Sequence, residues 1–414
     1  MSGGIKVAFL NENQKIWFIR ASSGKFAPNF QHAGIIAIRH LEEAMGNKLG
    51  AELPSEEEIT RCLLQNDKYY EFVEDKKTGR DIRALNRPGR VLLSQIKRFA
   101  NEIEAGDVIV TKNEVGGYNI GVCSDSQAYI DSEHVALPRL DEDSPVGPTL
   151  RYKFRKKVVW GPSVSHSDLP HTVRRATRGQ QTISSLSDHK VKIFHLIYPF
   201  FTDGENLYFS NKIRKRGDIN ALVVGKLFEN VSLASRFIEE LVGAYDLNLT
   251  DIADQLNKSI FADGEFVACQ AEFMSPGDMW CKIPLSAAFD LRNQVAAGVL
   301  VCLLLTGQSE AAQLGNVSEV SSSAVMVDQV NSDSPSTTIF NEKFKPAEPS
   351  KGFKELAEKL KKKSSEVEGF ESERATKEIQ ENLKLQMPSI DTSRLEKFNY
   401  GINVIEFRGL NENN

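Results

Sequence analysis

The hydrophobic pattern between residues 15 and 38 predicts two strands around a short helix. A run of apolar residues within Lys15–Ala21 predicts a strand buried on both faces, and a Ser-Ser-Gly turn follows it. A short helix is predicted over Ala27–Ala33, with Gly34 as the residue at positive φ that ends it, before a second strand over Ile35–Ile38. Two aromatic side chains and Arg20 are thereby expected beside the turn, which indicates a mouth for a flat ligand.

The rest of the first half alternates predicted strands with amphipathic helices. A polar, arginine-rich loop over Asp75–Arg90 precedes a helical period over Val91–Ile103. Two runs, Val108–Thr111 and Tyr118–Val122, flank a Gly-Gly turn and predict a hairpin. Basic and bulky residues alternate along Arg151–Trp160, which predicts a strand with one charged edge. We therefore expect residues 1–188 to form a β-rich, barrel-like domain with peripheral helices.

A second domain of α+β type is expected over residues 190–310, because strand and helix patterns alternate there. The predicted strands are Val191–Tyr198, Asn206–Ser210, Phe266–Phe273 and Met279–Ile283. The predicted helices are Asp218–Val242, Leu247–Leu256 and Leu285–Leu305. Residues 311–350 read as a linker by composition, and residues 351–414 as a charged helical tail with a terminal strand at Ile402–Phe407. The whole chain is thus predicted to be α+β.

Composition and charge narrow the class of protein. The 414 residues are 41% hydrophobic and 26% charged, with a formal net charge of −5, which suits a soluble protein and argues against wholesale coating of nucleic acid. Five widely separated cysteines without a Cys-x-x-Cys motif indicate a reducing compartment and no structural zinc, and no secretory signal is visible, so we expect a cytoplasmic location. The longest apolar run, Val295–Leu305, is shorter than the roughly 20 residues that span a bilayer, which favours a buried helix over membrane contact.

Three blocks of the first half resemble a known family. Trp17–Ile38, Arg98–Val122 and Tyr152–Leu186 are similar, in order and spacing, to the N-terminal domain of Mrr-like, modification-dependent restriction endonucleases. The resemblance implies a domain that docks on DNA, on an altered base in particular, and that is attached to a variable effector. The matching positions are Trp17, Arg20, Gly24, Phe26, Phe30, Gly106, Asp107, Gly121, Arg155, Trp160, Leu169, Arg174 and Gly179. Arg39-His40 replaces the Gly-Trp pair with which those domains usually end the second strand, which places base recognition in question.

Aromatic and basic residues of this half are the candidates for nucleic-acid contact. Trp17 is open to two interpretations, core packing and stacking on an unstacked base. The basic residues of the strand at 151–160 are either a solvated face or phosphate contacts, and three arginines follow them in the short basic helix at 171–179. The predicted nucleic-acid-binding residues are Trp17, Arg20, Lys25, Arg155, Lys156, Arg174 and Arg178.

Catalytic chemistry is not readable from the second half. A nuclease centre of the restriction type needs an Asp with Glu-x-Lys or Gln-x-Lys, and neither triplet occurs past residue 190, so no catalytic residue, metal or cofactor is assigned. We expect a protein that senses DNA or a modified nucleotide in a bacterial anti-phage defence or restriction system, with DNA, modified or phage-derived, as partner and homo-oligomerisation as a further expectation. The alternatives are a divergent metal-dependent endonuclease around Glu265 and Glu272, and a non-enzymatic effector whose Leu285–Leu305 helix drives oligomerisation or membrane contact.

Overall fold

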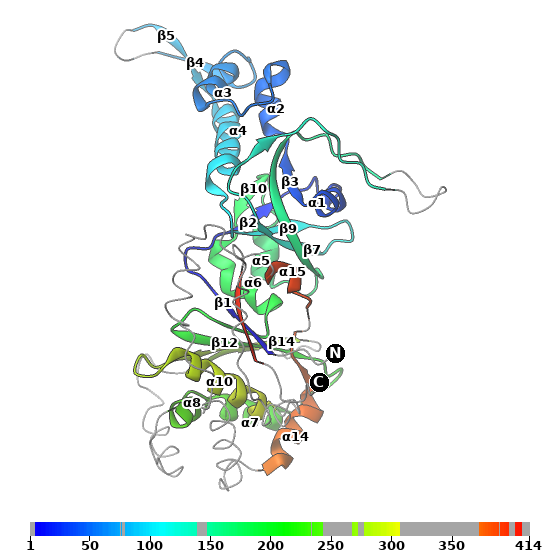
Figure 1. Ribbon diagram of the computed structural model, residues 1–414, viewed down its shortest axis with the longest axis vertical. Helices are drawn as coiled ribbons and strands as arrows, with labels where there is room; N and C mark the ends of the chain where they lie inside the picture. The colour runs from blue at the N-terminus through cyan, green and yellow to red at the C-terminus, as the bar shows by residue number, and fades with distance from the viewer. Residues whose placement is uncertain are drawn as a thin grey trace, which may run out of the picture. The chain divides into compact units, whose positions relative to one another are not determined.

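The chain folds into two units, each with its own sheet and helices (Figure 1). The computed structural model describes residues 5–74, 76, 79–138, 147–232, 234–242, 267–271, 277–306, 372–388, 390–396 and 402–407. What we call the inserted unit comprises Asn13–Lys192 and Asp391–Gly401, and the flanking unit comprises Met1–Glu12, Ile193–Ile390 and Ile402–Asn414. The predicted α+β class is confirmed. The change of unit after Lys192 lies close to the expected division at residue 188, whereas the first strand of the chain belongs to the flanking unit.

A curled sheet forms the body of the inserted unit, with the strand order β10-β2-β6-β7-β9-β3 and β8 beside β9. Its strands are β2 (Ile16–Ile19), β3 (Ile35–Ile38), β6 (Val108–Lys112), β7 (Tyr118–Cys123), β8 (Tyr129–Ile130), β9 (Phe154–Val164) and β10 (Ile183–Ser185). β2 and β6 run parallel, and the other neighbouring pairs run antiparallel. The long strand β9 pairs with both β7 and β3, and the sheet curls into a half-barrel, which confirms the barrel-like prediction.

Local signals set the opening turn and helix of this unit. Helix α1 (Ala27–Ala33) ends at Gly34, which has φ 65° and donates its N–H to the carbonyl of Phe30, as the sequence predicts. The preceding turn holds Ser22 and Ser23 at φ 48° and 60°, a region that non-glycine residues rarely adopt. A Cβ on Gly24 would lie 2.4 Å from the carbonyl oxygen of Asn113, so this position requires glycine.

Helices and a hairpin occupy the stretch between β3 and β6. The helical elements are α2 (His40–Met45), α3 (Glu56–Leu63), α4 (Arg87–Lys97) and a π-helical turn, η2 (Arg98–Glu102). Helix α3 begins with a capping box, in which Ser55 and Glu58 each accept a hydrogen bond from the backbone N–H of the other. The basic helix α5 (His171–Ala176) and the short α15 (Ser393–Glu396), which packs on β9 through Leu395 beside Gly161, complete the unit.

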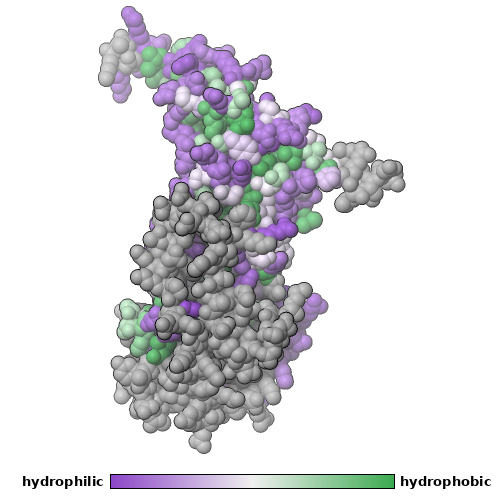
Figure 2. All heavy atoms as spheres, viewed as in Figure 1, coloured by the Kyte–Doolittle hydropathy of each residue, from purple (hydrophilic) through white to green (hydrophobic). Residues whose placement is uncertain are grey.

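The polar loop predicted over Asp75–Arg90 is wrong, because its second part forms a hairpin with the residues before it. Strands β4 (Tyr70–Glu74) and β5 (Asp81–Leu85) pair antiparallel, and the Arg83 guanidinium lies 4.5 Å from the centre of the Tyr70 ring. This cation–π contact and the cross-strand pairs outweigh the polar composition of the segment. Phe72 of this hairpin is 62% exposed, and Figure 2 shows hydrophobic surface among hydrophilic residues in this part of the molecule.

The flanking unit is built on a second sheet with the order β13-β14-β12-β11-β1-β16, and β15 pairs with β12. Its strands are β1 (Ile5–Phe9), β11 (Phe200–Thr202), β12 (Asn206–Ile213), β13 (Ala268–Ala271), β14 (Gly277–Pro284), β15 (Leu385–Gln386) and β16 (Asn403–Phe407). β1 runs parallel to β11 on one side and antiparallel to β16 on the other. Residues from the two ends of the chain therefore pair within one sheet.

Helices pack on this second sheet and enclose its core. They are α7 (Ala221–Ser232), α8 (Ala234–Val242), α10 (Leu291–Leu305) and α14 (Ser372–Leu383). The single helix predicted over Asp218–Val242 is thus two consecutive helices. Val295, Val299 and Cys302 of α10 are buried in the core, which is the interpretation favoured for this apolar run.

The strand predicted over Val191–Tyr198 is wrong, because the segment forms helix α6 (Lys190–Ile197). Its residues from Ile193 to Tyr198 are all buried. An uninterrupted apolar run has no period that separates a buried strand from a buried helix, and its β-branched and aromatic residues favour the strand by propensity alone.

Several sequence predictions lie outside the described residues. These are the helix at Leu247–Leu256, the linker at 311–350 and the tail up to residue 371. Among the helices that the structure does describe, none combines the length and the apolar character that crossing a membrane requires.

Candidate nucleic-acid interface

Three side chains from separate elements of the inserted unit meet at the segment Gln180–Thr182. Antiparallel pairing of β10 with β2 places this segment beside the end of β2, where the backbone N–H of Arg20 donates to the Thr182 carbonyl at 2.9 Å. The Arg20 guanidinium donates to the Gln180 carbonyl at 3.3 Å, and that of Arg98 donates to the Gln181 side chain at 3.4 Å. Nε2 of His40 lies 3.2 Å from the Thr182 hydroxyl. Long-range strand pairing thus gathers two guanidinium groups and one imidazole.

Helix α5 adds further arginines directly before this segment. Arg175 and Arg178 are exposed and Arg174 is half-buried, with its Nε atom buried and without a hydrogen-bond partner in the described part of the chain. The end of the helix is fixed by Thr177, whose hydroxyl donates to the Arg174 carbonyl and lies 2.9 Å from the Tyr118 hydroxyl on β7. We call Arg20, Arg98, Arg174 and Arg178 the basic arginine group.

The local charge supports this grouping. Residues 151–192 contain ten lysines and arginines and only two aspartates, in a chain whose net charge is −5. Two of the ten, Arg155 and Lys156, are buried, and the other eight are exposed or partly exposed. The overall negative charge therefore hides a strongly positive stretch. Cations of this density are the electrostatic requirement for contact with a phosphate backbone.

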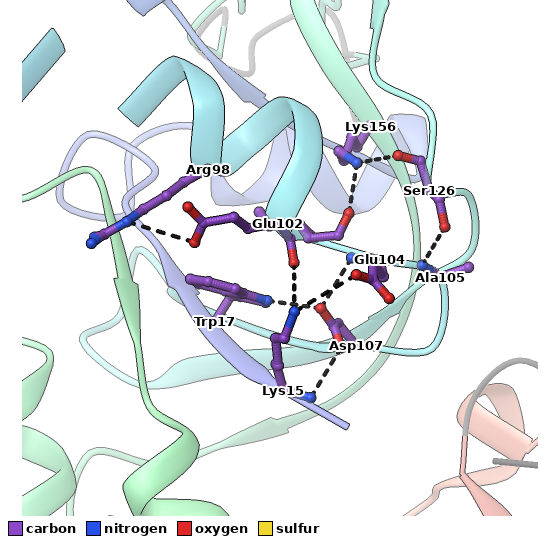
Figure 3. A network of polar contacts seen from close by, with 10 residues as sticks. Lys15, Trp17, Arg98, Glu102, Glu104, Ala105, Asp107, Ser126 and Lys156 are labelled. Atoms are coloured by element: carbon purple, nitrogen blue, oxygen red, sulfur yellow. Dashed lines mark hydrogen bonds and ion pairs between the residues drawn. The ribbon is translucent and has the colours of Figure 1, made fainter. Parts of the chain in front are cut away.

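Trp17 belongs to the core, which decides between its two interpretations. Its side chain is 4% exposed and its indole N–H donates to the Asp107 carboxylate at 2.8 Å (Figure 3). The backbone N–H groups of Lys15 and Glu104 donate to the same carboxylate at 3.0 Å each. Burial raises the pKa of Asp107, and these hydrogen bonds partly oppose the rise. The network ties the start of β2 to the loop before β6, so the predicted stacking role of Trp17 is wrong.

Lys156 is also a structural residue. Its side chain is fully buried, and Nζ donates to the carbonyl of Ile103 at 2.7 Å and to that of Ser126 (Figure 3). Burial lowers the pKa of Lys156. The ammonium therefore holds β9 to the loops that follow η2 and β7, and the phosphate contact predicted for it is wrong.

Arg155, next to Lys156 on β9, is likewise a buried structural residue. It is 3% exposed, forms an ion pair with Asp131, and donates to the carbonyls of Tyr152 and Glu133. All of these partners lie in the inserted unit, so the guanidinium holds the segment around β8 against β9. The predicted contact of Arg155 with phosphate is therefore wrong, because its donors are already bound inside the protein.

Lys25 lies on the strained turn after β2. Its Nζ is 5.6 Å from the centre of the Phe26 ring, and that ring meets the ring of Tyr152 edge to face at 5.2 Å. The Ser22 hydroxyl lies 3.2 Å from the Tyr152 hydroxyl. The exposed ammonium and the two half-buried aromatic rings make this turn a second polar and aromatic feature of the inserted unit. The aromatic residues beside this turn are thus Phe26 and Tyr152, and not Trp17 as the sequence predicted.

His40 and Arg98 are the members of the interface that sequence reasoning missed. In the sequence, His40 is notable only because Arg39-His40 replaces a Gly-Trp pair, and Arg98 only as a position within the helix predicted over Val91–Ile103. Burial lowers the pKa of His40, and its Nδ1 is buried without a hydrogen-bond partner among the described residues. The pairing of β10 with β2 joins them to Gln180–Thr182, and no local signal in the sequence specifies that pairing.

The flanking unit offers no metal centre within its described residues. Glu265 and Glu272, proposed above as ligands of a divergent nuclease, lie outside the described residues. No cluster of three or more His, Cys, Asp or Glu side chains in the described part of the chain could hold a metal ion.

The chain was compared with protein families, curated proteins and solved structures. No family model, no curated protein and no solved structure matches the chain.

Proposed function

We propose that the protein is a DNA sensor whose inserted unit binds the phosphate backbone through the basic arginine group. The observation that carries the proposal is the convergence of Arg20 and Arg98 on Gln180–Thr182, directly after the arginines of α5. Guanidinium groups suit this role because their planar donors match phosphate oxygens. The glutamine side chains of Gln180 and Gln181, both exposed, add neutral donors to the same site.

In this proposal, the residues of the turn that carries Lys25 contact a base or a modified nucleotide. Trp17 is committed to Asp107, whereas Phe26 and Tyr152 are half-buried and lie beside the exposed ammonium of Lys25. Aromatic faces of this kind stack on unpaired bases. Phosphate positioning by the arginines and base contact by the turn would together make a recognition domain like that of the restriction endonucleases that the sequence resembles.

The biological setting follows from the same resemblance. We place the protein in the cytoplasm of a bacterium, in a defence or restriction system, with the flanking unit as the effector or oligomerising part. The scattered cysteines without a Cys-x-x-Cys motif suit a reducing compartment.

Salt-titrated binding of the full chain to a short DNA duplex tests the proposal. The full chain is needed because residues 391–401 belong to the inserted unit. In Arg174→Ala/Arg178→Ala, we expect the slope of log affinity against log salt to shrink by about two, because each phosphate contact contributes about 0.9.

Arg61→Ala/Arg80→Ala is the matched control, since it removes two exposed arginines from α3 and the segment before β5. The proposal predicts that this control keeps the wild-type slope. Equal slopes for the wild type and both variants would contradict the assigned surface, and absence of binding at low salt would contradict DNA sensing as a whole.

A further inference from the structure

Two cysteines of the flanking unit lie side by side on neighbouring strands. Cys269 on β13 is directly opposite Cys281 on β14, and their sulfur atoms are 2.9 Å apart. Directly opposed residues of an antiparallel pair have the Cα separation that a disulfide requires, and the covalent bond is about 2.05 Å long. In the sequence these cysteines are separated and carry no motif, so the pair becomes visible only through strand register.

The surroundings give the two thiols different access to solvent. Cys281 is 1% exposed, because its strand lies between β12 and β13, whereas Cys269 is partly exposed on β13 at the edge of the sheet. Cys302 of α10 lies in the same core and is 2% exposed. The hydrogen bond with Cys269, together with burial, holds the pKa of Cys281 well above its ordinary value. A reagent from solution therefore meets Cys269 first.

We propose that Cys269 and Cys281 are a redox modification site, which forms an intramolecular disulfide by exchange with a small-molecule disulfide such as oxidised glutathione. The inference is independent of DNA binding, since it concerns another unit and other chemistry.

The exchange balances in two steps. The Cys269 thiolate attacks one sulfur of oxidised glutathione, which gives a Cys269–glutathione mixed disulfide and releases one glutathione thiolate. The Cys281 thiol then attacks the Cys269 sulfur, which closes the Cys269–Cys281 bond, and the departing second glutathione leaves as a thiol with the proton that Cys281 loses. The protein loses two electrons and two protons, and oxidised glutathione is reduced to two molecules of glutathione. The product would tether the edge strand β13 covalently to β14.

Incubation of the full chain with oxidised glutathione, followed by intact mass and peptide mapping, tests the site. We expect the wild type to lose two hydrogen masses with a crosslink between the peptides of Cys269 and Cys281. Cys302→Ser is the matched control and is expected to form the same crosslink. Cys269→Ser is expected to form none, and it changes a partly exposed position.

Cys281→Ala gives the sharpest signature. Without the second thiol, the exchange should stop after its first step, and Cys269 should retain one glutathione. A wild type that keeps both thiols free, a wild type that stops at the glutathione adduct, or a crosslink that Cys302→Ser abolishes would each overturn the proposal. In the oxidised wild type, hydrogen exchange at the β13 amides should also slow relative to the reduced protein, because the tether opposes local opening.

Discussion

Two basic clusters of the inserted unit differ in burial: one lies in the interior and the other on the surface. On β9, Arg155 and Lys156 are buried and their donors are bound to backbone carbonyls and to Asp131. On and after α5, Arg175 and Arg178 are exposed. In the sequence, both clusters consist of several lysines or arginines within about ten residues, interrupted by bulky or apolar side chains. A positive charge in a strand can therefore stabilise the interior, where it donates to backbone carbonyls of the loops beside the sheet.

The largest expected effect comes from removing the buried ammonium. In Lys156→Ala, the carbonyls of Ile103 and Ser126 lose their donor and a cavity opens, so the free energy of unfolding should fall by about 3 kcal/mol in urea titrations. Lys157→Ala is the control, because the neighbouring side chain is exposed and should change stability by less than about 0.5 kcal/mol. An equal loss of unfolding free energy in the two variants would contradict a stabilising role for the buried ammonium of Lys156.

A buried imidazole in the flanking unit extends the comparison to pH. His195 stacks on Trp280 at 4.9 Å, and its Nδ1 lies 2.7 Å from the Ser210 hydroxyl. Burial lowers the pKa of His195 to about 3. The folded-state pKa is below that of the unfolded chain, so the contribution of the neutral imidazole is fully present above about pH 6.5 and is lost as the pH falls toward 3.

The measurement is the difference in free energy of unfolding between the wild type and His195→Gln from pH 7 to pH 4. We expect the wild type to lose up to about 1.4 kcal/mol per pH unit relative to the variant below pH 6.5. The exposed His32 provides the control, since His32→Gln should follow the wild type throughout. A pH-independent difference for His195→Gln would show that the imidazole is not held neutral by burial.

The smallest effect concerns Trp17. Trp17→Phe keeps an aromatic ring but removes the donor to Asp107, so the unfolding free energy should fall by about 1 to 2 kcal/mol while the affinity for duplex DNA stays unchanged. The two quantities are measured on the same preparation by urea titration and by DNA binding. A lower affinity for DNA with unchanged stability would instead indicate that Trp17 contacts DNA, and it would contradict the assignment of Trp17 to the core.

Local chemistry made part of the fold predictable. The bounds of α1 and β3 and the role of Gly34 followed from turn residues and a short apolar run. The helix α6 was missed because an apolar run without period fits either element. The hairpin β4–β5 was missed because its cation–π contact joins residues of opposite strands.

The candidate sites depended on longer-range contacts. Arg174 and Arg178 were proposed for the candidate interface from the basic composition around them, whereas Arg98 and His40 approach the same segment only through the pairing of β10 with β2. The approach of Cys269 to Cys281 likewise requires the register between β13 and β14. Sequence patterns report what a residue is and which local element it occupies, but partner strands are set by the packing of the whole unit.

Strand β1 lies far in sequence from both of the strands with which it pairs, which affects how the chain folds during synthesis. Its residues pair with β11 on one side and with β16 on the other, for example Val7 with Phe200 and with Ile405. Because a ribosome makes the chain from its N-terminus, β1 is made about 190 residues before its partner β11 and about 400 residues before its partner β16. The inserted unit can reach its fold almost completely in that interval. Nascent chains halted before β16 would carry an open strand edge, and such an edge invites pairing with other chains.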